Sequence, residues 1–407
     1  TGFGRTGTVD WQTGSIKTST FTAANGEGYF ANTSGGAFTM NLPAGSAGAI
    51  VSVVDYTNTF QTNALTISPN GSEKIGGVAA DAILSTEGQS VTFVYIDGTE
   101  GWKNVQDSTS NTTGNTSIVA SGGTVTTCGD FKIHTFTGPG SFSVSQVDAV
   151  TAANNTVSYL VVAGGGGGSD NQAGAGGAGG FREFRAPVSG CYSVSPLNGS
   201  TPITITAQSY PIVIGGGGTG NPASNGGNST ALSITSTGGG GGGATGGVGN
   251  NGGSGGGGGS LTPGTGAGSG NTPPVSPPQG KDGGGRSPDT DAGGGAGGGA
   301  TTAGSQGGNR PAAGGPGGAG ATTSIIGSST AYAGGGGSGQ GGSPGGPLPG
   351  GAGGVGGGGN GSGAGSGGTA GADNTGGGGG SGGNPSPGPG AGASGGSGIV
   401  IIRYKFQ

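Results

Sequence analysis

The stretch SYLVVAGGGGG at Ser158–Gly168 decides the fold, because a run of apolar residues passes directly into five glycines. SYPIVIGGGG (Ser209–Gly218) has the same order, and GGSGIVIIRYKFQ (Gly395–Gln407) has it reversed. Short apolar runs rich in β-branched residues are typical of buried strands. We expect Tyr159–Ala163 and Ile399–Tyr404 to be neighbouring strands. The glycine-rich region between them is then an excursion whose two ends return together.

The region 215–398 has almost nothing from which a conventional core could form. The chain has 407 residues and 116 glycines, with 7% charged and 5% aromatic residues. Glycines come in runs of four to six, separated by inserts of Ser, Thr, Asn, Ala and Pro. Runs of this kind exclude collagen, which needs glycine at every third position. Such a composition is typical of disorder, but the flanking strand sequences favour an ordered insertion.

Ordered glycine must be stabilised by its backbone. Fixing each residue costs about 1–2 kcal/mol, and glycine has no side chain whose burial could offset that cost. A polyproline II-type helix has three residues per turn and no internal hydrogen bonds, so its N–H and C=O groups point outward. Without Cβ atoms, such helices can pack side by side and hydrogen-bond to one another. The sequence therefore predicts a bundle of packed polyglycine II helices over 215–398.

Residues 1–107 predict an N-terminal β-sandwich-like domain. SVTFVYIDGTEGWK (Ser90–Lys103) alternates with a period of two, and Asp97-Gly98 supplies a tight turn for a hairpin. GEGYFANTSGGAFTMNLP (Gly26–Pro43) predicts two further short strands around paired glycines. Gly77–Ser85 is the one candidate for a turn of helix. We expect an all-β chain with almost no α-helix.

The rest of the chain predicts a polar linker, a second β-domain and the bundle. The boundaries are 108–120 for the linker, 121–214 for the β-domain, 215–398 for the bundle and 399–407 for a C-terminal strand returning to the β-domain. A hairpin is expected with Gly138-Pro139-Gly140 at its bend.

A loose repeat joins NSTALSITSTGGGGGG (228–243) and TTSIIGSSTAYAGGGGSG (322–339), since each has a polar and aliphatic lead-in before glycines. Cys128 and Cys191 either form a disulfide or are two small buried apolar side chains.

Several classes of function are disfavoured. The formal net charge is -5 with only 12 scattered Lys and Arg residues, which argues against a nucleic-acid partner. No apolar run reaches the roughly 18 residues of a membrane helix. His134 is a lone histidine in an expected strand and is interpreted as structural. We expect no enzyme, cofactor or metal site. The chain begins with Thr1, and we expect it to be processed or truncated there.

One stretch concentrates charge. NTPPVSPPQGKDGGGRSPDTD (Asn271–Asp291) is stiffened by prolines, and the only other charged residues of the glycine-rich region are Arg310 and Asp373. It is either a solvated loop that keeps the tip soluble or a contact surface for a sugar or a surface protein. The candidate contact residues are Lys281, Asp282, Arg286, Asp289, Asp291 and Arg310.

These junctions of strand and glycine resemble the glycine-rich domain of bacteriophage tail-fibre proteins, common in marine phages. The N-terminal stretches TSTFTAANGEGYFANTSGGAFTMNLPAGSAGAIVSVVDY and SVTFVYIDGTEGWKNVQDSTS are similar to the β-domain often found upstream of it. The resemblance implies a virion tail fibre or receptor-binding protein, extracellular and homotrimeric. Its implied partners are further copies of the chain, upstream tail or fibre proteins, and a host surface glycan or outer-membrane protein.

Other functions stay open. The main alternative is a self-assembling structural protein of an extracellular filament or sheath. Ice binding would need regular ranks of Thr or Ala, and a glycan-degrading enzyme would need an acid–base pair. The inserts show neither.

Overall fold

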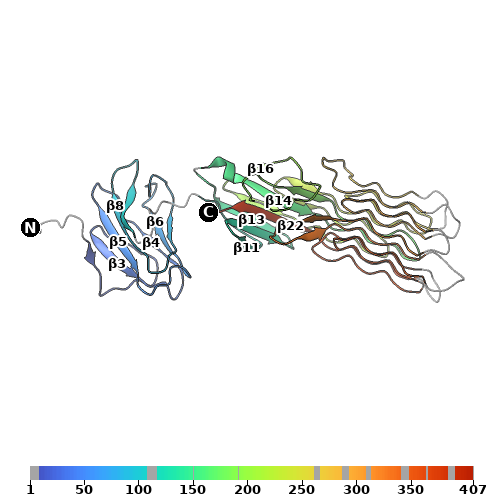
Figure 1. The fold of residues 1–407 in the computed structure, drawn as a ribbon, viewed down its shortest axis with the longest axis horizontal. Helices are drawn as coiled ribbons and strands as arrows, with labels where there is room; N and C mark the ends of the chain where they lie inside the picture. Colours follow the sequence, from blue (N-terminus) through green and yellow to red (C-terminus); the bar gives the residue numbers. More distant parts are fainter. Residues whose placement is uncertain are drawn as a thin grey trace, which may run out of the picture. The chain divides into compact units, whose positions relative to one another are not determined.

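The computed structural model of the chain describes residues 9–107, 117–149, 151–190, 192–260, 266–286, 293–308, 313–340, 348–363, 365–383 and 390–406. By its internal contacts the chain divides into two units, Thr1–Thr116 and Ser117–Gln407. Within the described ranges the one helical element is a 3₁₀ turn, η1 at Ala152–Asn155. All other regular elements are strands, so the predicted all-β class is confirmed (Figure 1).

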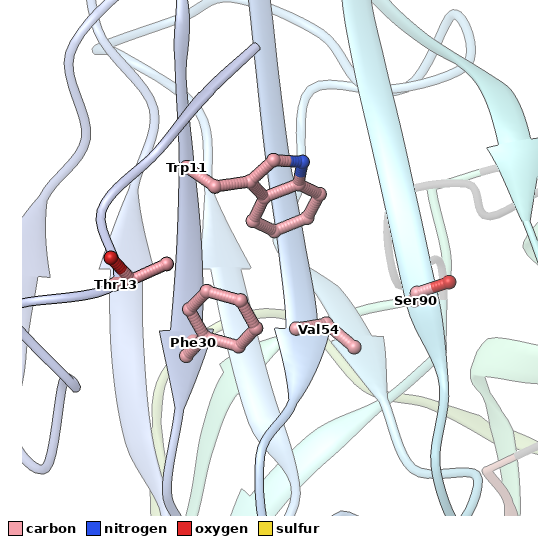
Figure 2. Close-up of a pocket in the computed structure, with 5 residues that line it drawn as sticks. All are labelled: Trp11, Thr13, Phe30, Val54 and Ser90. Atoms are coloured by element: carbon pink, nitrogen blue, oxygen red, sulfur yellow. The ribbon is translucent and has the colours of Figure 1, made fainter. Parts of the chain in front are cut away.

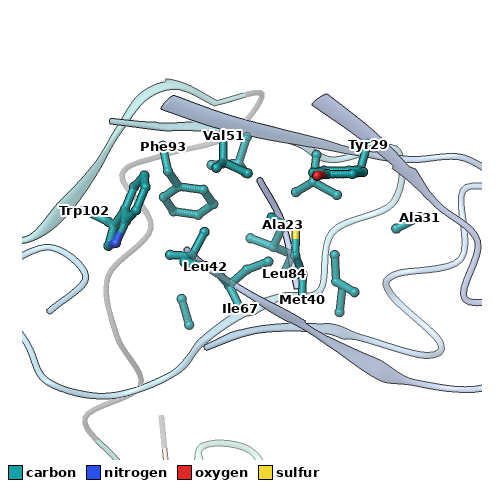
Figure 3. Close-up of a cluster of buried hydrophobic side chains, with 14 of the residues drawn as sticks. Ala23, Tyr29, Ala31, Met40, Leu42, Val51, Ile67, Leu84, Phe93 and Trp102 are labelled. Carbon is teal, nitrogen blue, oxygen red and sulfur yellow. The ribbon is translucent and has the colours of Figure 1, made fainter. Parts of the chain in front are cut away.

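The first unit is two sheets packed around one core. Its strands are β1 (Asp10–Trp11), β2 (Phe21–Thr22), β3 (Glu27–Ala31), β4 (Phe38–Asn41), β5 (Ile50–Asp55), β6 (Leu65–Ser68), β7 (Ala82–Leu84), β8 (Ser90–Tyr95) and β9 (Trp102–Asp107). One sheet has the order β1-β3-β5-β8-β9 and the other β2-β4-β6-β7. From β1 to β6 the chain alternates between the sheets, so neighbours there pair in parallel. Inward-facing side chains of both sheets, including Met40, Leu84, Phe93 and Trp102, form the core (Figure 3).

Of the sequence-based expectations for the first unit, some are confirmed by the structure and one is wrong. The hairpin at Asp97-Gly98 is confirmed, with Tyr95 opposite Trp102 in β8 and β9. The two strands expected in Gly26–Pro43 are present as β3 and β4, but they lie in opposite sheets. The helical turn expected in Gly77–Ser85 is wrong, because β7 occupies that stretch. Ala82 and Leu84 are fully buried there and Ile83 is 48% exposed, which is the period of a strand and not of a helix.

The second unit contains the remaining strands. They are β10 (Val119–Ser121), β11 (Thr124–Cys128), β12 (Phe131–Phe136), β13 (Gly140–Gln146), β14 (Thr156–Val162), β15 (Phe181–Phe184), β16 (Ile203–Thr204), β17 (Ser209–Ile212), β18 (Ser229–Ala231), β19 (Ile234–Ser236), β20 (Ala321–Thr323), β21 (Thr330–Tyr332) and β22 (Ile399–Lys405). The largest sheet has the order β11-β12-β22-β14-β15, with β16 also pairing with β14. A smaller sheet has the order β10-β13-β17.

The expected neighbours β14 and β22 do pair. They are antiparallel, with Val162 opposite Ile399 and Tyr159 opposite Ile402. Both faces of this pair are covered. Tyr159 and Ile402 pack into one hydrophobic cluster, whereas Val162 and Ile399 pack into another on the opposite face. Burial on both faces explains why these strands are apolar at nearly every position.

Two expectations for the second unit are corrected. No hairpin forms at Gly138-Pro139-Gly140, because β12 pairs with β11 and β22, whereas β13 pairs with β10 and β17. The linker predicted at 108–120 lies mostly outside the described residues, but Ile118 is only 1% exposed and packs into the core. Cys128 carries a free thiol, and Cys191 lies outside the described residues.

The loose repeat corresponds to a repeated structure. In each copy a two-stranded hairpin, β18–β19 or β20–β21, is followed directly by a glycine run. Glycine runs also follow β14 and the residues after β17, and others lead back into β15, β18 and β22. In Figure 1 the glycine segments extend side by side from one end of the sheets of this unit.

Backbone hydrogen bonds join the glycine segments with a period of three residues. Segment 173–180, which is buried throughout, shows this best. Its donor→acceptor pairs are Gly174→Gly243, Ala175→Gly295, Gly176→Gly379, Gly177→Gly240, Ala178→Gly298, Gly179→Gly376 and Gly180→Thr237. Every third N–H therefore reaches the same neighbouring segment.

The carbonyl groups of segment 173–180 bind other segments. Carbonyl oxygens of this segment accept bonds from Ala163, Gly166, Ser169, Ser254, Gly257 and Gly336. Three neighbours thus accept from the segment and three different neighbours donate to it. Backbone groups that lack any internal partner are satisfied in this way.

Glycine is needed where segments approach one another this closely. A Cβ on Gly166 would collide with the carbonyl of Gly240, and one on Gly177 would collide with the carbonyl of Ser254. By contrast, a Cβ on Gly216 would meet nothing within 4 Å. The inner segments therefore require glycine or a well-placed alanine, while outer positions tolerate side chains.

Candidate functional site

A pocket lies at the end of the glycine segments that is farthest from the sheets. Segment 164–169 leaves β14 and segment 173–180 returns to β15, so the turn 170–172 is at that end. The turn at 221–223, between the residues after β17 and β18, lies beside it. The pocket has a volume of about 230 Å³, and its lining includes Ser169, Asp170, Asn221, Pro222, Val248 and Asn250.

The polar groups of this pocket are held by neighbouring turns. Asn221 Nδ2 donates to Asp170 Oδ2 over 3.3 Å, which joins the first two turns. Thr219 Oγ1 donates to the carbonyl of Pro222 at 2.8 Å. Asn250 Nδ2 donates to Asn225 Oδ1 at 2.9 Å. The amide and carboxylate oxygens are therefore fixed in position by a rigid backbone.

The same pocket also has an apolar side. Val248 is 60% exposed although it borders the pocket, and Pro222 and Ala244 are also exposed lining residues. A large exposed apolar side chain is unusual in a region so poor in them. The pocket thus places a small apolar surface beside hydrogen-bonding groups, a combination typical of ligand sites.

The charged stretch 271–291 does not form one loop. Residues 271–279 fold back on themselves at the sheet end of the bundle. There Asn271 Oδ1 accepts bonds from the backbone N–H groups of Val275 and Gln279, and Gln279 Oε1 accepts one from Thr237, next to β19. Residues 280–286 instead form one of the glycine segments.

The predicted contact residues are therefore dispersed. Lys281 and Asp282 are exposed, and Asp282 Oδ1 accepts a bond from the N–H of Gly270 at 2.7 Å. Arg286 is only 5% exposed, so its side chain is a poor candidate for surface contact. Asp289, Asp291 and Arg310 lie outside the described residues. Sequence reasoning missed Asp170 and Asn221, whose only signal is a polar insert between glycine runs.

The first unit has an apolar pocket on the outer face of its five-stranded sheet. It has a volume of about 460 Å³ and is lined by Trp11, Thr13, Phe30, Val54 and Ser90 (Figure 2). The rings of Trp11 and Phe30 are 5.2 Å apart, and Trp11 is 41% exposed. The indole lies over Gly28, where a Cβ would stand 2.7 Å from the ring.

Comparison with models of known protein families shows to which family the chain belongs. The family model for the glycine-rich domain matches residues 137–405, which is more than half of the chain. The chain belongs to the glycine-rich domain family. A search of curated proteins found no match. The matched region begins just before β13 and ends in β22, so the glycine-rich domain includes strands of both sheets as well as the glycine segments.

Buried charges hold the sheets of the glycine-rich domain together. Arg403 of β22 is 3% exposed and donates to the carbonyls of Ser189 at 3.2 Å and Ile325 at 3.1 Å. Its guanidinium also lies 4.6 Å from the ring centre of Phe131, a cation–π contact. The hairpin β20–β21 and the loop after β15 are thereby fixed to the C-terminal strand.

Glu183 of β15 is the buried carboxylate on the same side of the sheet. It is 2% exposed and accepts bonds from Thr323 Oγ1 at 2.6 Å and the Ser195 N–H at 2.9 Å. Burial raises the pKa of this carboxyl, and these hydrogen bonds offset only part of that effect. The contacts are all internal, so Glu183 has a structural role.

His134 is also engaged in internal contacts. It is fully buried, with Nδ1 2.7 Å from the Gly122 carbonyl and Nε2 3.1 Å from Tyr404 Oη. Burial lowers the pKa of this imidazole. Among the described residues no three His, Cys, Asp or Glu side chains gather as a metal site would require. No described helix is long and apolar enough to cross a membrane.

Proposed function

We propose that this chain is a non-catalytic fibre protein of a phage virion, which attaches the particle to the surface of a host cell. The glycine-rich domain acts as the recognition tip, and its far end contacts the receptor. The observation that carries the proposal is the set of cross-bonded glycine segments, which hold the turns at 170–172 and 221–223 on a rigid support. Loops on a rigid scaffold are a common arrangement for binding.

The glycine segments in this proposal are polyglycine II helices. The three-residue period of their hydrogen bonds supports this, because such a helix has three residues per turn. The six neighbours of segment 173–180 support it too. With three residues per turn, the N–H groups point outward about 120° apart, and so do the C=O groups, which gives three directions for donors and three for acceptors. Slow hydrogen exchange of glycine amides in 164–180 is expected, and exchange at the rate of an unfolded chain would contradict it.

Attachment is tested with the fluorescently labelled full chain on a panel of marine bacterial strains. We expect saturable binding to a subset of strains, and inhibition of phage adsorption on those strains by unlabelled chain. If the chain binds saturably to no strain of the panel, the proposal is overturned. The same proposal implies that the chain binds other proteins of the virion, including upstream tail proteins.

A second candidate is a self-assembling extracellular filament. The apolar pocket at Trp11 favours contacts between chains, because exposed apolar surfaces of this kind mark interaction sites. Sedimentation distinguishes the two candidates. A discrete trimer supports the fibre, whereas open polymers of varying length support the filament.

A further inference from the structure

We infer that the pocket beside Asp170, Asn221 and Asn250 binds a single neutral sugar residue of a surface glycan. This inference rests on the proposed function and names the chemistry of the receptor. It also moves the contact away from Lys281 and Arg286, which do not line this pocket.

The polar lining suits sugar hydroxyl groups. Asp170 Oδ1 and the side-chain oxygens of Asn221 and Asn250 make no bond to other described residues, although each side chain is anchored through another atom. These oxygens accept hydrogen bonds, and the two amide groups also donate. A hydroxyl group both donates and accepts, so sugar hydroxyl groups match the hydrogen-bonding chemistry of these side chains.

The apolar lining suits the C–H face of a sugar ring. Val248 is 60% exposed and borders the pocket together with Pro222 and Ala244. Covering Val248 removes apolar surface from water, which favours binding. The volume of about 230 Å³ is below the roughly 300–1,000 Å³ of sites for larger ligands, so one sugar residue is the expected occupant.

The charge of the pocket selects against anionic sugars. Asp170 is the one charged side chain among the described lining residues, and no Lys or Arg is among them. A carboxylate next to a phosphate or a second carboxylate would be repelled. Neutral hexoses and N-acetylhexosamines are therefore the ligand class.

The test uses the full chain and saturation-transfer NMR. The probes are glucose, galactose, mannose and N-acetylglucosamine, with glucose 6-phosphate and N-acetylneuraminic acid as anionic comparisons. We expect at least one neutral sugar to bind with a Kd on the order of 1 mM. Asp170→Asn and Asn250→Ala should each weaken that binding about tenfold.

The control variant is Asp373→Asn. Asp373 is an exposed carboxylate that accepts a bond from the N–H of Ser397 and does not line the pocket. It should bind sugar as the unchanged chain does. Matching thermal unfolding of all variants shows that they fold alike.

Three outcomes overturn the inference: no binding of any neutral sugar, preferential binding of the anionic sugars, or equal affinity in the Asp170→Asn, Asn250→Ala and Asp373→Asn variants. Cell attachment is measured separately with the same variants. Sugar binding without attachment supports the pocket and overturns the proposed function. Attachment that persists without sugar binding overturns the pocket alone.

Discussion

Val162 and Ile399 lie opposite each other in β14 and β22, at the point where both strands meet the glycine segments. Beyond Val162 the chain enters the first glycine segment, and after returns to this sheet in β15 and β16 it comes back for the last described strand at Ile399. Both side chains are buried in the same hydrophobic cluster. This pair therefore holds the start of the first glycine segment next to the end of the last one.

The first prediction concerns the link between β22 and the glycine segments. Ile402 is fully buried in β22, so Ile402→Ala should lower the free energy of unfolding by about 2–5 kcal/mol. The same substitution should accelerate hydrogen exchange of the amides in 164–168, because β22 pairs with β14, from which that segment leaves the sheet. The control is Lys405→Ala at the end of the same strand, which should change stability by less than about 0.5 kcal/mol. Unchanged exchange in 164–168 would show that the glycine segments are stable without the sheet.

The second prediction compares two glycines of the glycine segments. Gly166→Ala places a methyl group against the carbonyl of Gly240, and overpacking of this kind costs about 1–3 kcal/mol. Gly216→Ala meets nothing within 4 Å and should leave stability within about 0.5 kcal/mol. Thermal unfolding measures both. Equal melting temperatures would contradict close packing at Gly166.

The third prediction is a pH dependence set by Glu183. Burial raises the pKa of this carboxyl in the folded state, so the folded protein keeps the proton at pH values where the unfolded chain has lost it. The contribution of Glu183 to stability is then fully present below the unfolded pKa of about 4.3 and is lost as the pH rises through the folded pKa. Glu183→Gln should remove that fall.

Melting temperatures between about pH 4 and pH 7 measure this effect. The control is Glu100→Gln, because Glu100 is a half-exposed carboxylate of the first unit that pairs with Lys103 at the surface. That variant should follow the pH profile of the unchanged chain. A Glu183→Gln profile parallel to the unchanged chain would assign the dependence to another group.

The fourth prediction concerns the aromatic face of the first unit. Gly28→Ala brings a Cβ within 2.7 Å of the Trp11 ring, so the indole must move away from β3. We expect a red shift of tryptophan fluorescence. The free energy of unfolding should fall by about 1–3 kcal/mol. Gly98→Ala is the control, since a Cβ there meets nothing within 4 Å. An unchanged emission spectrum would mean that Trp11 does not rest on Gly28.

The sequence predicts this fold best where burial leaves a clear pattern. The residues of β14 and β22 are apolar at nearly every position, which is the pattern of strands covered on both faces, and their pairing is present. The hairpin β8–β9 has its turn residues at the expected place. Gly138-Pro139-Gly140 has equally good turn residues but joins strands of different sheets, and a turn sequence alone does not distinguish these outcomes.

The candidate site was harder to predict. Glycine runs give no side-chain signal of which segments are neighbours, so the meeting of Asp170 and Asn221 could not be deduced. For the same reason the stretch 271–291 reads as one loop although residues 280–286 belong to a packed segment. Arg286 is buried there because the segments around it are close, which charge patterning does not reveal.

The central place of β22 also has a consequence during synthesis. Ribosomes make the chain from its N-terminus, and β22 lies between β12 and β14 although it is translated after every other described strand. Until then β12 and β14 each have an unpaired edge, the kind of edge to which other strands bind. The glycine-rich domain can therefore complete its folding only once β22 has been made, and chaperones that cover open sheet edges are the helpers it would need in a cell until then.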